Sequence, residues 1–407
     1  MKLKLIAVAS LLLCVVSGYA DEGMWLLGRL NKNKQVKQIV KEMGLKTPVK
    51  KIYNPGGQSL SNAIVSFGGF CSGVVVSADG LVFTNHHCGF SSIQQHSTVA
   101  HDYLKEGFVA QTLSEELPNP ELYVRFLVRT EDVTKRVLKG VSPTMKESER
   151  RQVIDSIASL IAHEVSVKDS TLVGMVDTYY AGNEYWLSVY RDYTDVRLVF
   201  APPSSVGKFG WDTDNWVWPR HTGDFAVFRI YTGQDGKPAE YSKENIPLKP
   251  KHHLPISLDG VSNGAFTMIL GYPGSTDRYR SSWGVELAIE ESNPTVVSIR
   301  DKKLNVMRKY MDASDEVRIQ YASKWAGTSN YWKYYIGQTR GLKRLRVVDK
   351  KVRPVYFYSV DISEFAVNKL KDRGSLSATA IVTNVQDFIV NVAKGLKIAE
   401  NKNMSVL

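Results

Sequence analysis

The chain contains the stretch Phe70-Cys71-Ser72-Gly73-Val74-Val75-Val76, then Ser77-Ala78-Asp79-Gly80, then Leu81-Val82-Phe83-Thr84-Asn85-His86-His87-Cys88-Gly89. Two short apolar runs, Gly73–Ser77 and Leu81–Thr84, flank a segment with the composition of a tight turn. The stretch therefore predicts a β-hairpin. Cys71 opens its first strand, and Cys88 follows one hairpin later, directly after His87.

Short apolar runs separated by turn residues continue on both sides of this hairpin. They are Ala63–Phe67, Leu122–Arg129, Thr171–Tyr180, Tyr185–Tyr190, Asp195–Phe200, Phe225–Tyr231 and Phe266–Leu270. Many short strands with frequent turn signals favour a β-barrel domain.

Helical patterns precede, interrupt and follow the strands. A lysine-rich helix is expected around Gly28–Lys41, and Ser142 is expected to cap a helix that runs to about Glu164. Apolar residues at helical spacing in the second helix predict one buried face: Ile154, Ile157, Leu160 and Ile161. From about residue 282 the pattern is mainly helical, with helices over Asn293–Met311, Glu316–Lys324 and Tyr331–Lys351. The fold class expected is thus mixed β and α, with a β-barrel followed by a mainly α-helical domain.

The first 20 residues have the three parts of a secretory signal peptide. Lys2 and Lys4 give a positive start, Leu5–Val16 is apolar, and Gly18-Tyr19-Ala20 supplies small residues for cleavage after Ala20. The apolar part is too short for a membrane anchor. An exported, periplasmic protein is therefore expected.

Export also bears on the cysteines, which number three in the whole chain. Cys14 leaves with the signal, and the remaining pair, Cys71 and Cys88, is expected to form a disulfide in an oxidising compartment. Closing a loop of about 17 residues is worth on the order of 3 kcal/mol in the chain-entropy model. The alternative is two buried free thiols.

Length and composition set wider bounds. The chain has 407 residues, 43% of them hydrophobic and 23% charged, which predicts two or three folded domains and excludes a disordered or collagen-like chain. No apolar run after residue 20 is long enough to span a membrane. The net charge of +11 could serve nucleic acid or an anionic surface. Because no nucleic-acid-binding motif accompanies it, a basic surface on a protein without a nucleic-acid partner is expected.

Two residues have the features of a catalytic pair. His87 lies where the predicted disulfide would immobilise a general base. Asp224 opens the apolar strand Phe225–Tyr231, where a carboxylate needs a partner, and a His imidazole is one such partner. The alternatives are a polar loop for His86 and His87 and a turn-capping role for Asp224. Trp216, Trp218, Asn215 and several charges nearby suggest a lined pocket.

His86, His87, His96 and His101 are candidate metal ligands. Adjacent side chains on an extended segment point in opposite directions, and His163-Glu164 lacks the second histidine of a zinc-protease motif. No phosphate-binding or dinucleotide-binding glycine motif is present either. Neither a metal nor a cofactor is expected.

Four segments together resemble a known family, the bacterial periplasmic serine dipeptidyl-peptidases of the chymotrypsin clan. They are Thr84-Asn85-His86-His87-Cys88-Gly89, Asp195–Pro203, Asn215–Asp224 and Gly271–Tyr279, and the resemblance extends over about residues 21–350. It implies a chymotrypsin-like double β-barrel with an inserted helical domain. It also implies a His–Asp–Ser triad that releases dipeptides from the free N-termini of peptides.

The resemblance assigns roles to five residues of this chain. His87 would be the general base and Asp224 would orient it, while Asn215, Trp216 and Asn330 would bind the free α-amine of the peptide substrate. The chemistry agrees, because an Asn carbonyl can accept from an ammonium and a Trp can wall a subsite. A homodimer of the full-length form is a further expectation.

The nucleophilic serine of the family has no counterpart in this sequence. The nearest candidates, Ser204-Ser205-Val206-Gly207 and Gly274-Ser275-Thr276, lie in segments that the family uses otherwise. The expected organisation is a signal peptide (1–20), the first barrel (21–281) and the start of a truncated helical domain (282–407). Because the serine is missing, little or no peptidase activity is expected of this chain alone. The alternative is a non-catalytic or degenerate peptide-binding homologue.

Overall fold

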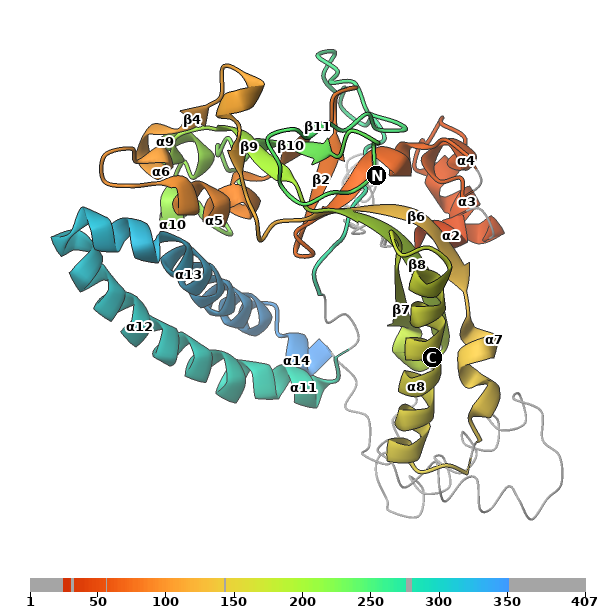
Figure 1. Cartoon of the computed structure of the whole chain (residues 1–407). Coiled ribbons are helices and arrows are strands. Elements are labelled where there is room, and N and C mark those ends of the chain that lie inside the picture. Colours follow the sequence, from red (N-terminus) through yellow and green to blue (C-terminus); the bar gives the residue numbers. More distant parts are fainter. Residues whose placement is uncertain (1–24, 31–32, 56, 143, 276–279, 351–407) are drawn as a thin grey trace, which may run out of the picture.

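The computed structural model describes residues 25–30, 33–55, 57–142, 144–275 and 280–350. The expected signal peptide lies outside these residues. Figure 1 shows a curved sheet with short helices around it, an arm in which helix α8 (Glu147–Lys168) covers strands, and a separate pair of long helices. Within the described ranges, no helix is long and apolar enough to cross a membrane.

The sheet is antiparallel at every described pairing. Its main path is β4 (Phe108–Val109), β9 (Val196–Ala201), β10 (Ala226–Thr232), β3 (Leu81–Thr84), β2 (Cys71–Val75), β1 (Ile64–Phe67), β6 (Val124–Asp132), β8 (Glu184–Tyr193) and β7 (Val173–Tyr179). Short β5 (Leu117–Pro118) pairs with β9, and β11 (Ile246–Pro247) pairs with β10. The predicted hairpin is β2–β3, which confirms that part of the sequence analysis.

The expected mixture of β and α structure is confirmed, but closure of a barrel is not. Among the described strands, β4 and β7 stand at the two ends of the pairing path and do not pair with each other. The physical reason is that β7 pairs only with β8 and extends with it into the arm. The sheet therefore curves around a core without a closed ring of backbone hydrogen bonds.

The main core lies on the concave side of strands β1, β2, β3, β9 and β10. Phe67 and Phe228 are fully buried and meet edge to face, with ring centroids 4.8 Å apart. Alternate residues of each strand point inward, as the strand period requires. Other fully buried members are Val65, Val75, Val82, Leu198 and Ile230. This burial of apolar surface is what holds the strands that carry the site.

The arm has a smaller core of its own. It consists of the outer halves of β6, β7 and β8, the short helices α7 (Thr134–Val137) and η3 (Leu138–Gly140), and α8. Helix α8 begins at Glu147 rather than at Ser142, whose hydroxyl instead accepts from the Thr144 main chain in the preceding turn. Ile154 and Ile161 are buried, whereas Leu160 is 55% exposed. Leu160 lies off their face at 100° per residue, so its predicted burial was wrong.

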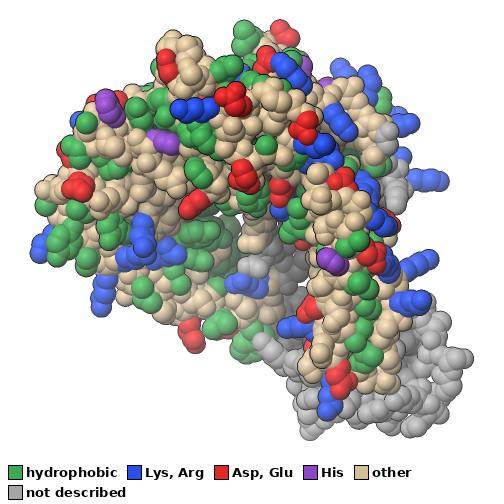
Figure 2. All heavy atoms as spheres, in the orientation of Figure 1, with side chains coloured by type: hydrophobic (Ala, Val, Ile, Leu, Met, Phe, Trp, Pro, Cys, Tyr) green, Lys and Arg blue, Asp and Glu red, His purple; other side chains and the backbone are tan. Residues whose placement is uncertain are grey.

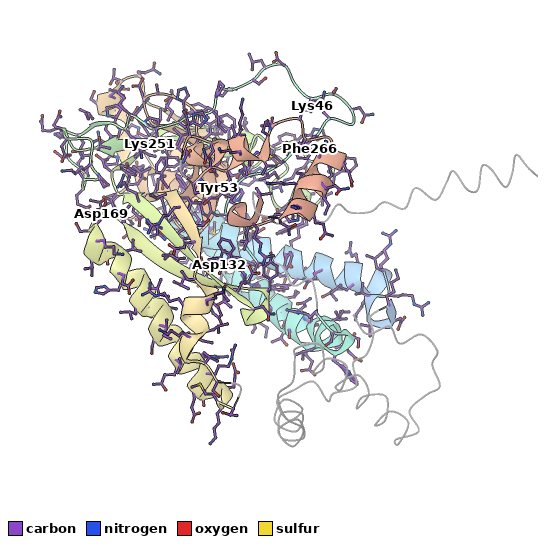
Figure 3. All side chains as sticks on the ribbon, turned by 90° about the vertical axis from the view of Figure 1, so that its right-hand side faces the viewer. Lys46, Tyr53, Asp132, Asp169, Lys251 and Phe266 are labelled. Carbon is purple, nitrogen blue, oxygen red and sulfur yellow. A yellow bond between two sulfur atoms is a disulfide. The ribbon has the colours of Figure 1, made fainter. Side chains whose placement is uncertain are left out.

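At the N-terminal end, the single predicted helix is two helices, α2 (Leu27–Leu30) and α3 (Lys34–Glu42), followed by α4 (Val49–Ile52). The prediction of one continuous helix was wrong because Asn33 starts a new one: its side chain caps α3 by accepting from two main-chain N–H groups. Tyr53, labelled in Figure 3, follows α4. Its hydroxyl lies 2.7 Å from that of Thr130 in β6, and this contact ties these helices to the sheet.

The helical part follows residue 281. It comprises α11 (Ser282–Leu287), the π-helical turn η5 (Ala288–Ser292), α12 (Asn293–Ala313), α13 (Asp315–Arg344) and α14 (Val347–Lys350). Ser314 caps α13 and lets it run back along α12 (Figure 1). The two predicted helices Glu316–Lys324 and Tyr331–Lys351 are thus mostly one helix, and Lys351 lies outside the described residues. The domain division at 281 stays a prediction.

One predicted strand is absent. Phe266–Leu270 has no regular structure in the described chain, and Ile269 is 98% exposed. This apolar run does not pair with the edge of any described strand. The remaining short helices are η1 (Leu60–Ala63), α5 (His86–His96), α6 (Tyr103–Glu106), η2 (Leu113–Glu115), η4 (Tyr180–Gly182), α9 (Ser204–Gly207) and α10 (Trp211–Asp214).

Candidate active site

His87 stands in the first turn of helix α5, immediately after strand β3. The predicted strand Leu81–Thr84 ends at Thr84, and the chain then turns into a helix at His86. The first N–H groups of a helix lack partners inside the helix. Here the main-chain N–H of His87 donates to Oδ1 of Asp224 at 3.0 Å. The start of the helix and the position of Asp224 are therefore coupled.

The same carboxylate holds the His87 ring. Asp224 Oδ2 lies 2.7 Å from His87 Nδ1, and the side-chain amide of Asn85 donates to this oxygen at 3.3 Å and to the Asp224 carbonyl at 3.2 Å. The contribution of Asn85 was missed by the sequence analysis. Burial alone would raise the pKa of Asp224, but the hydrogen bonds and charge of His87 outweigh it and lower that pKa. Asp224 is thus an ionised acceptor for Nδ1–H.

The other ring nitrogen of His87 faces solvent. The His87 side chain is 64% exposed, against 24% for Asp224. Within the part of the chain that the structure describes, no hydrogen bond reaches Nε2 of His87. With Nδ1 held by a carboxylate, Nε2 is available to accept a proton.

The expected disulfide between Cys71 and Cys88 is present. It joins the start of β2 to α5, one residue after His87. His87 and the two sulfurs lie within 4.8 Å of one another, a grouping that resembles a metal-ligand set. The ligand form of cysteine is the thiolate, whereas these sulfurs are bonded to each other, so the group serves as a brace for α5.

His86 points the opposite way, into the protein, and is fully buried. Among the residues that the structure describes, neither of its ring nitrogens has a hydrogen-bond partner within the usual geometry, although the Pro202 carbonyl is close enough to favour protonation slightly. Burial lowers its pKa to about 4, against the attraction of Asp224. A Cβ on Gly207 would come within 2.4 Å of the His86 ring, so Gly207 is the residue that makes room for it.

The three residues assigned to the substrate amine are brought together from two segments. Asn215 and Trp216 follow α10, whereas Asn330 lies in α13. Asn215 Nδ2 donates to Asn330 Oδ1 at 2.9 Å, and Trp216 Nε1 donates to the Asn330 carbonyl at 3.1 Å. Trp216 is 56% exposed, and its backbone φ is +60°. No described hydrogen bond uses Oδ1 of Asn215, which leaves an acceptor for a ligand.

Lys208, just after α9, interacts electrostatically with both Asp224 of the catalytic pair and Asp212 near the amine-binding residues. Its ammonium lies 5.0 Å from the centre of the Phe90 ring. Burial lowers the pKa of Lys208, and both carboxylates oppose this. Asp212 is one of the charges near Asn215 that suggested a pocket, but the sequence assigned no role to it or to Lys208, because their roles depend on contacts made only in the folded chain.

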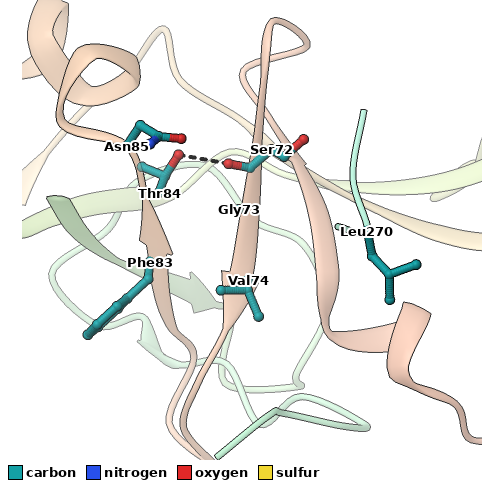
Figure 4. Close-up of a pocket in the computed structure, with 7 residues that line it drawn as sticks. All are labelled: Ser72, Gly73, Val74, Phe83, Thr84, Asn85 and Leu270. Atoms are coloured by element: carbon teal, nitrogen blue, oxygen red, sulfur yellow. Dashed lines mark hydrogen bonds between the residues drawn. The ribbon is translucent and has the colours of Figure 1, made fainter. Parts of the chain in front are cut away.

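A shallow cavity of about 240 Å³ is lined in part by Asn85, which donates to Asp224 (Figure 4). Its lining comes from β2, β3 and a distant segment: Ser72, Gly73, Val74, Phe83, Thr84, Asn85 and Leu270. The Ser72 hydroxyl accepts from the Tyr272 main chain at 2.7 Å, which holds that segment against β2. Tyr272 belongs to the quoted stretch Gly271–Tyr279, of which residues 276–279 lie outside the described chain.

Comparison with known proteins gives the same family throughout. The model of the Peptidase S46 family matches residues 20–355. Dipeptidyl-peptidase 7 of Porphyromonas endodontalis is 49% identical over 353 residues, covering 86% of this chain and 43% of the relative. An Asp/Glu-specific dipeptidyl-peptidase of Flavobacterium psychrophilum is 44% identical, covering 84% of this chain and 48% of the relative.

A solved structure agrees. Porphyromonas endodontalis DPP11 in complex with the dipeptide Arg-Asp superposes with a TM-score of 0.77 at 38% identity, covering 86% of this chain and 52% of that one. The chain thus spans about half the length of the curated relatives it matches. The family model, the identities and the superposition agree, and the chain belongs to the peptidase S46 family.

Proposed function

We propose that this chain carries the general base and the amine-binding part of a serine-type dipeptidyl-peptidase, which hydrolyses peptides two residues from a free N-terminus. The observation that carries the proposal is the His87–Asp224 pair, with Nδ1 and Oδ2 2.7 Å apart and Nε2 open to solvent. This pair and the cluster of Asn215, Trp216 and Asn330 would both be needed for such a reaction.

The pair suits acyl transfer. Asp224 accepts from Nδ1–H and so keeps the tautomer in which Nε2 is unprotonated. Nε2 would take the proton of a serine hydroxyl as it attacks the scissile carbonyl and would then give it to the leaving amine. In the proposal the serine belongs to a segment outside the described residues, since no described hydroxyl hydrogen-bonds to Nε2.

The amine cluster suits selection of dipeptides. An enzyme that releases dipeptides must close the cleft beyond the first residue of the peptide and bind the charged N-terminal amine there. Asn215 Oδ1 is a free acceptor for an ammonium, and the exposed Trp216 ring can wall the subsite. The relatives' names agree with dipeptide release, and the DPP11 structure is described as holding the dipeptide Arg-Asp.

Three finer points belong to the proposal. The core of β1, β2, β3, β9 and β10 is proposed as the first barrel of a chymotrypsin-like pair. The apolar N-terminus of the sequence supports export to the periplasm. A homodimer is proposed for the full-length form.

Lys/Arg and Asp/Glu side chains are interspersed over the face of the molecule in Figure 2, so the net charge of +11 forms no continuous positive stripe on that face.

A hydrolysis assay with matched variants tests the proposal. Fused to the C-terminal part of the P. endodontalis dipeptidyl-peptidase 7 that it resembles, the chain is expected to release dipeptides from a fluorogenic substrate. Asp224→Asn should lower kcat by about 10⁴-fold, because the wrong His87 tautomer is then favoured. Asp235→Asn, at an exposed carboxylate paired with Lys237, is the control and should leave kcat unchanged.

The 407-residue chain alone should give little or no turnover, and turnover sensitive to a serine-directed inhibitor would refute that expectation. The second candidate function, a non-catalytic peptide-binding homologue, is favoured by one observation: no described hydroxyl accompanies His87 Nε2. A fused protein that binds dipeptides but does not hydrolyse them would support it. An open reading frame continuing into a glycine-flanked serine would argue against it.

A further inference from the structure

Asp212, in the short helix α10, makes contacts that the proposed reaction does not use directly. Its carboxylate is half-buried against α13. Oδ1 accepts from the hydroxyl of Ser329 at 2.9 Å, and Oδ2 accepts from the indole N–H of Trp325 at 3.2 Å. One carboxylate therefore engages two side chains one helical turn apart, which fixes both the distance and the register between α10 and α13.

Lys333 strengthens the same junction from one turn further along α13. Its ammonium donates to the main-chain carbonyls of Asp212 and Thr213. These carbonyls belong to α10, a helix of four residues, too short to form internal hydrogen bonds with all of its main-chain groups. The junction thus satisfies main-chain carbonyls of α10 through Lys333 and the Asp212 carboxylate through Ser329 and Trp325.

The loop that this junction holds is strained. Trp211, directly before Asp212, has φ +46°, and Trp216 has φ +60°. A non-glycine residue in the left-handed region costs free energy, and such a conformation persists only where its surroundings fix it. Between these two residues lies Asn215, whose amide meets Asn330, the direct neighbour of Ser329. A shift of one residue at Ser329 would therefore separate the amine-binding groups.

A second set of contacts joins α13 to helix α5 and to the start of α6, away from this loop. Gln94, near the end of α5, donates to the Gln320 carbonyl at 2.9 Å and accepts from the Ser323 main chain at 2.7 Å. Arg318 pairs with Asp102 nearby. The helix would thus remain docked without the Asp212 carboxylate, whereas the amine-binding loop would lose its contacts with Ser329 and Trp325 and keep only those of Lys333 with its main chain.

We propose that Asp212 is a positioning residue for recognition of the substrate's free amine: through Ser329 and Trp325 it holds Asn215 and Trp216 in register with Asn330. The inference rests on the proposed function, because it takes that cluster to be the amine subsite. It goes beyond that function in assigning selectivity for a free over a blocked N-terminus to a residue outside the subsite.

Binding to the purified 407-residue chain tests this. The probes are Arg-Asp and N-acetyl-Arg-Asp, and titration calorimetry gives the ratio of their dissociation constants. The parent chain should bind the free amine about tenfold more tightly, the worth of a hydrogen bond to a charged group. Asp212→Ala should reduce the ratio to about one, and Asp212→Asn, which keeps one acceptor, should give an intermediate ratio.

Two further variants make the ratio decisive. Ser329→Ala alters the junction from the α13 side and should lower the ratio even if Asp212→Ala does not fold. Gln94→Ala removes two hydrogen bonds from the same helix and should leave the ratio unchanged. A parent ratio of about one would overturn the proposed amine subsite, and this inference with it. A high parent ratio retained in folded Asp212→Ala or in Ser329→Ala would overturn the inference and leave the proposed function standing.

Discussion

The catalytic pair and the amine cluster are built in different ways. Ala226 of β10 pairs with Thr84 of β3, so main-chain pairing fixes the separation of His87 and Asp224, which lie just beyond these strands. The amine cluster has no such pairing: Asn215 and Asn330 are 115 residues apart and meet through side chains. Sheet register thus sets the geometry of the catalytic pair, whereas the placement of one helix sets that of the amine cluster.

Removing the disulfide should loosen the region around His87 and Asp224, here called the catalytic end, more than the region around Asn215, Trp216 and Asn330, the amine end. Replacing Cys71 and Cys88 by Ala releases a loop with a sequence separation of 17, which should lower the free energy of unfolding by about 3 kcal/mol. Urea unfolding of the parent and the double variant measures the loss. Since the bridge braces α5, amide exchange should rise in α5 and β2 more than in α13. A uniform rise in both regions would show that the two ends do not respond separately.

The same contrast explains what could be predicted from the sequence. The hairpin, the cysteine pair and the resemblance around His87 and Asp224 depend on residues close together in the chain or on long motifs, and the structure places His87 beside Asp224. The start of α5 at His86 was missed, because Thr84-Asn85-His86-His87 has no apolar helical period and its helix is held by Asp224, 137 residues away.

Helix α13 shows why a short window of sequence cannot predict an element that long-range contacts stabilise. The two helices predicted from the sequence, Glu316–Lys324 and Tyr331–Lys351, left residues 325–330 outside any helix. The helix continues because Thr328 and Ser329 are buried and satisfy their hydroxyls on it, Thr328 donating to the Lys324 carbonyl at 2.7 Å. Ser329 also meets Asp212, and nothing within a short window of sequence indicates that contact.

Gly207→Ala tests how tightly the catalytic end is packed. The new Cβ would lie 2.4 Å from the His86 ring, and a buried ring leaves no space to yield. We expect a loss of about 2 kcal/mol in the free energy of unfolding, measured by urea denaturation. Gly337→Ala is the matched control in α13: its Cβ meets open space, so it should be neutral or stabilising.

The contact with His86 can be isolated by a double-variant cycle. If the ring causes the loss, Gly207→Ala should cost much less in a His86→Ala background, with a coupling well above about 0.5 kcal/mol. Additive losses would place the strain elsewhere. They would also weaken the view that the catalytic end is the more closely packed of the two.

The smallest expected effect is a pH dependence due to the same histidine. Burial lowers the pKa of His86 to about 4, with Asp224 opposing and Lys208 and His87 assisting. The unfolded chain, with a His pKa of about 6.5, therefore binds more protons than the folded chain between these values. Stability is retained above pH 6.5 and falls as pH drops toward 4. Between pH 7 and pH 5.5 the loss from this group should be about 1 kcal/mol.

Urea unfolding at the two pH values, in the parent and in His86→Leu, measures this contribution. The leucine has no proton to bind, so the pH-dependent loss should shrink by that amount. The half-buried His96, whose pKa burial also lowers, remains in both proteins and supplies the residual slope. An unchanged slope in His86→Leu would assign the destabilising proton to His96 or another group. The catalytic end would then owe its acid sensitivity to a residue outside the immediate surroundings of Asp224, and the contrast with the amine end would rest on backbone pairing and the disulfide alone.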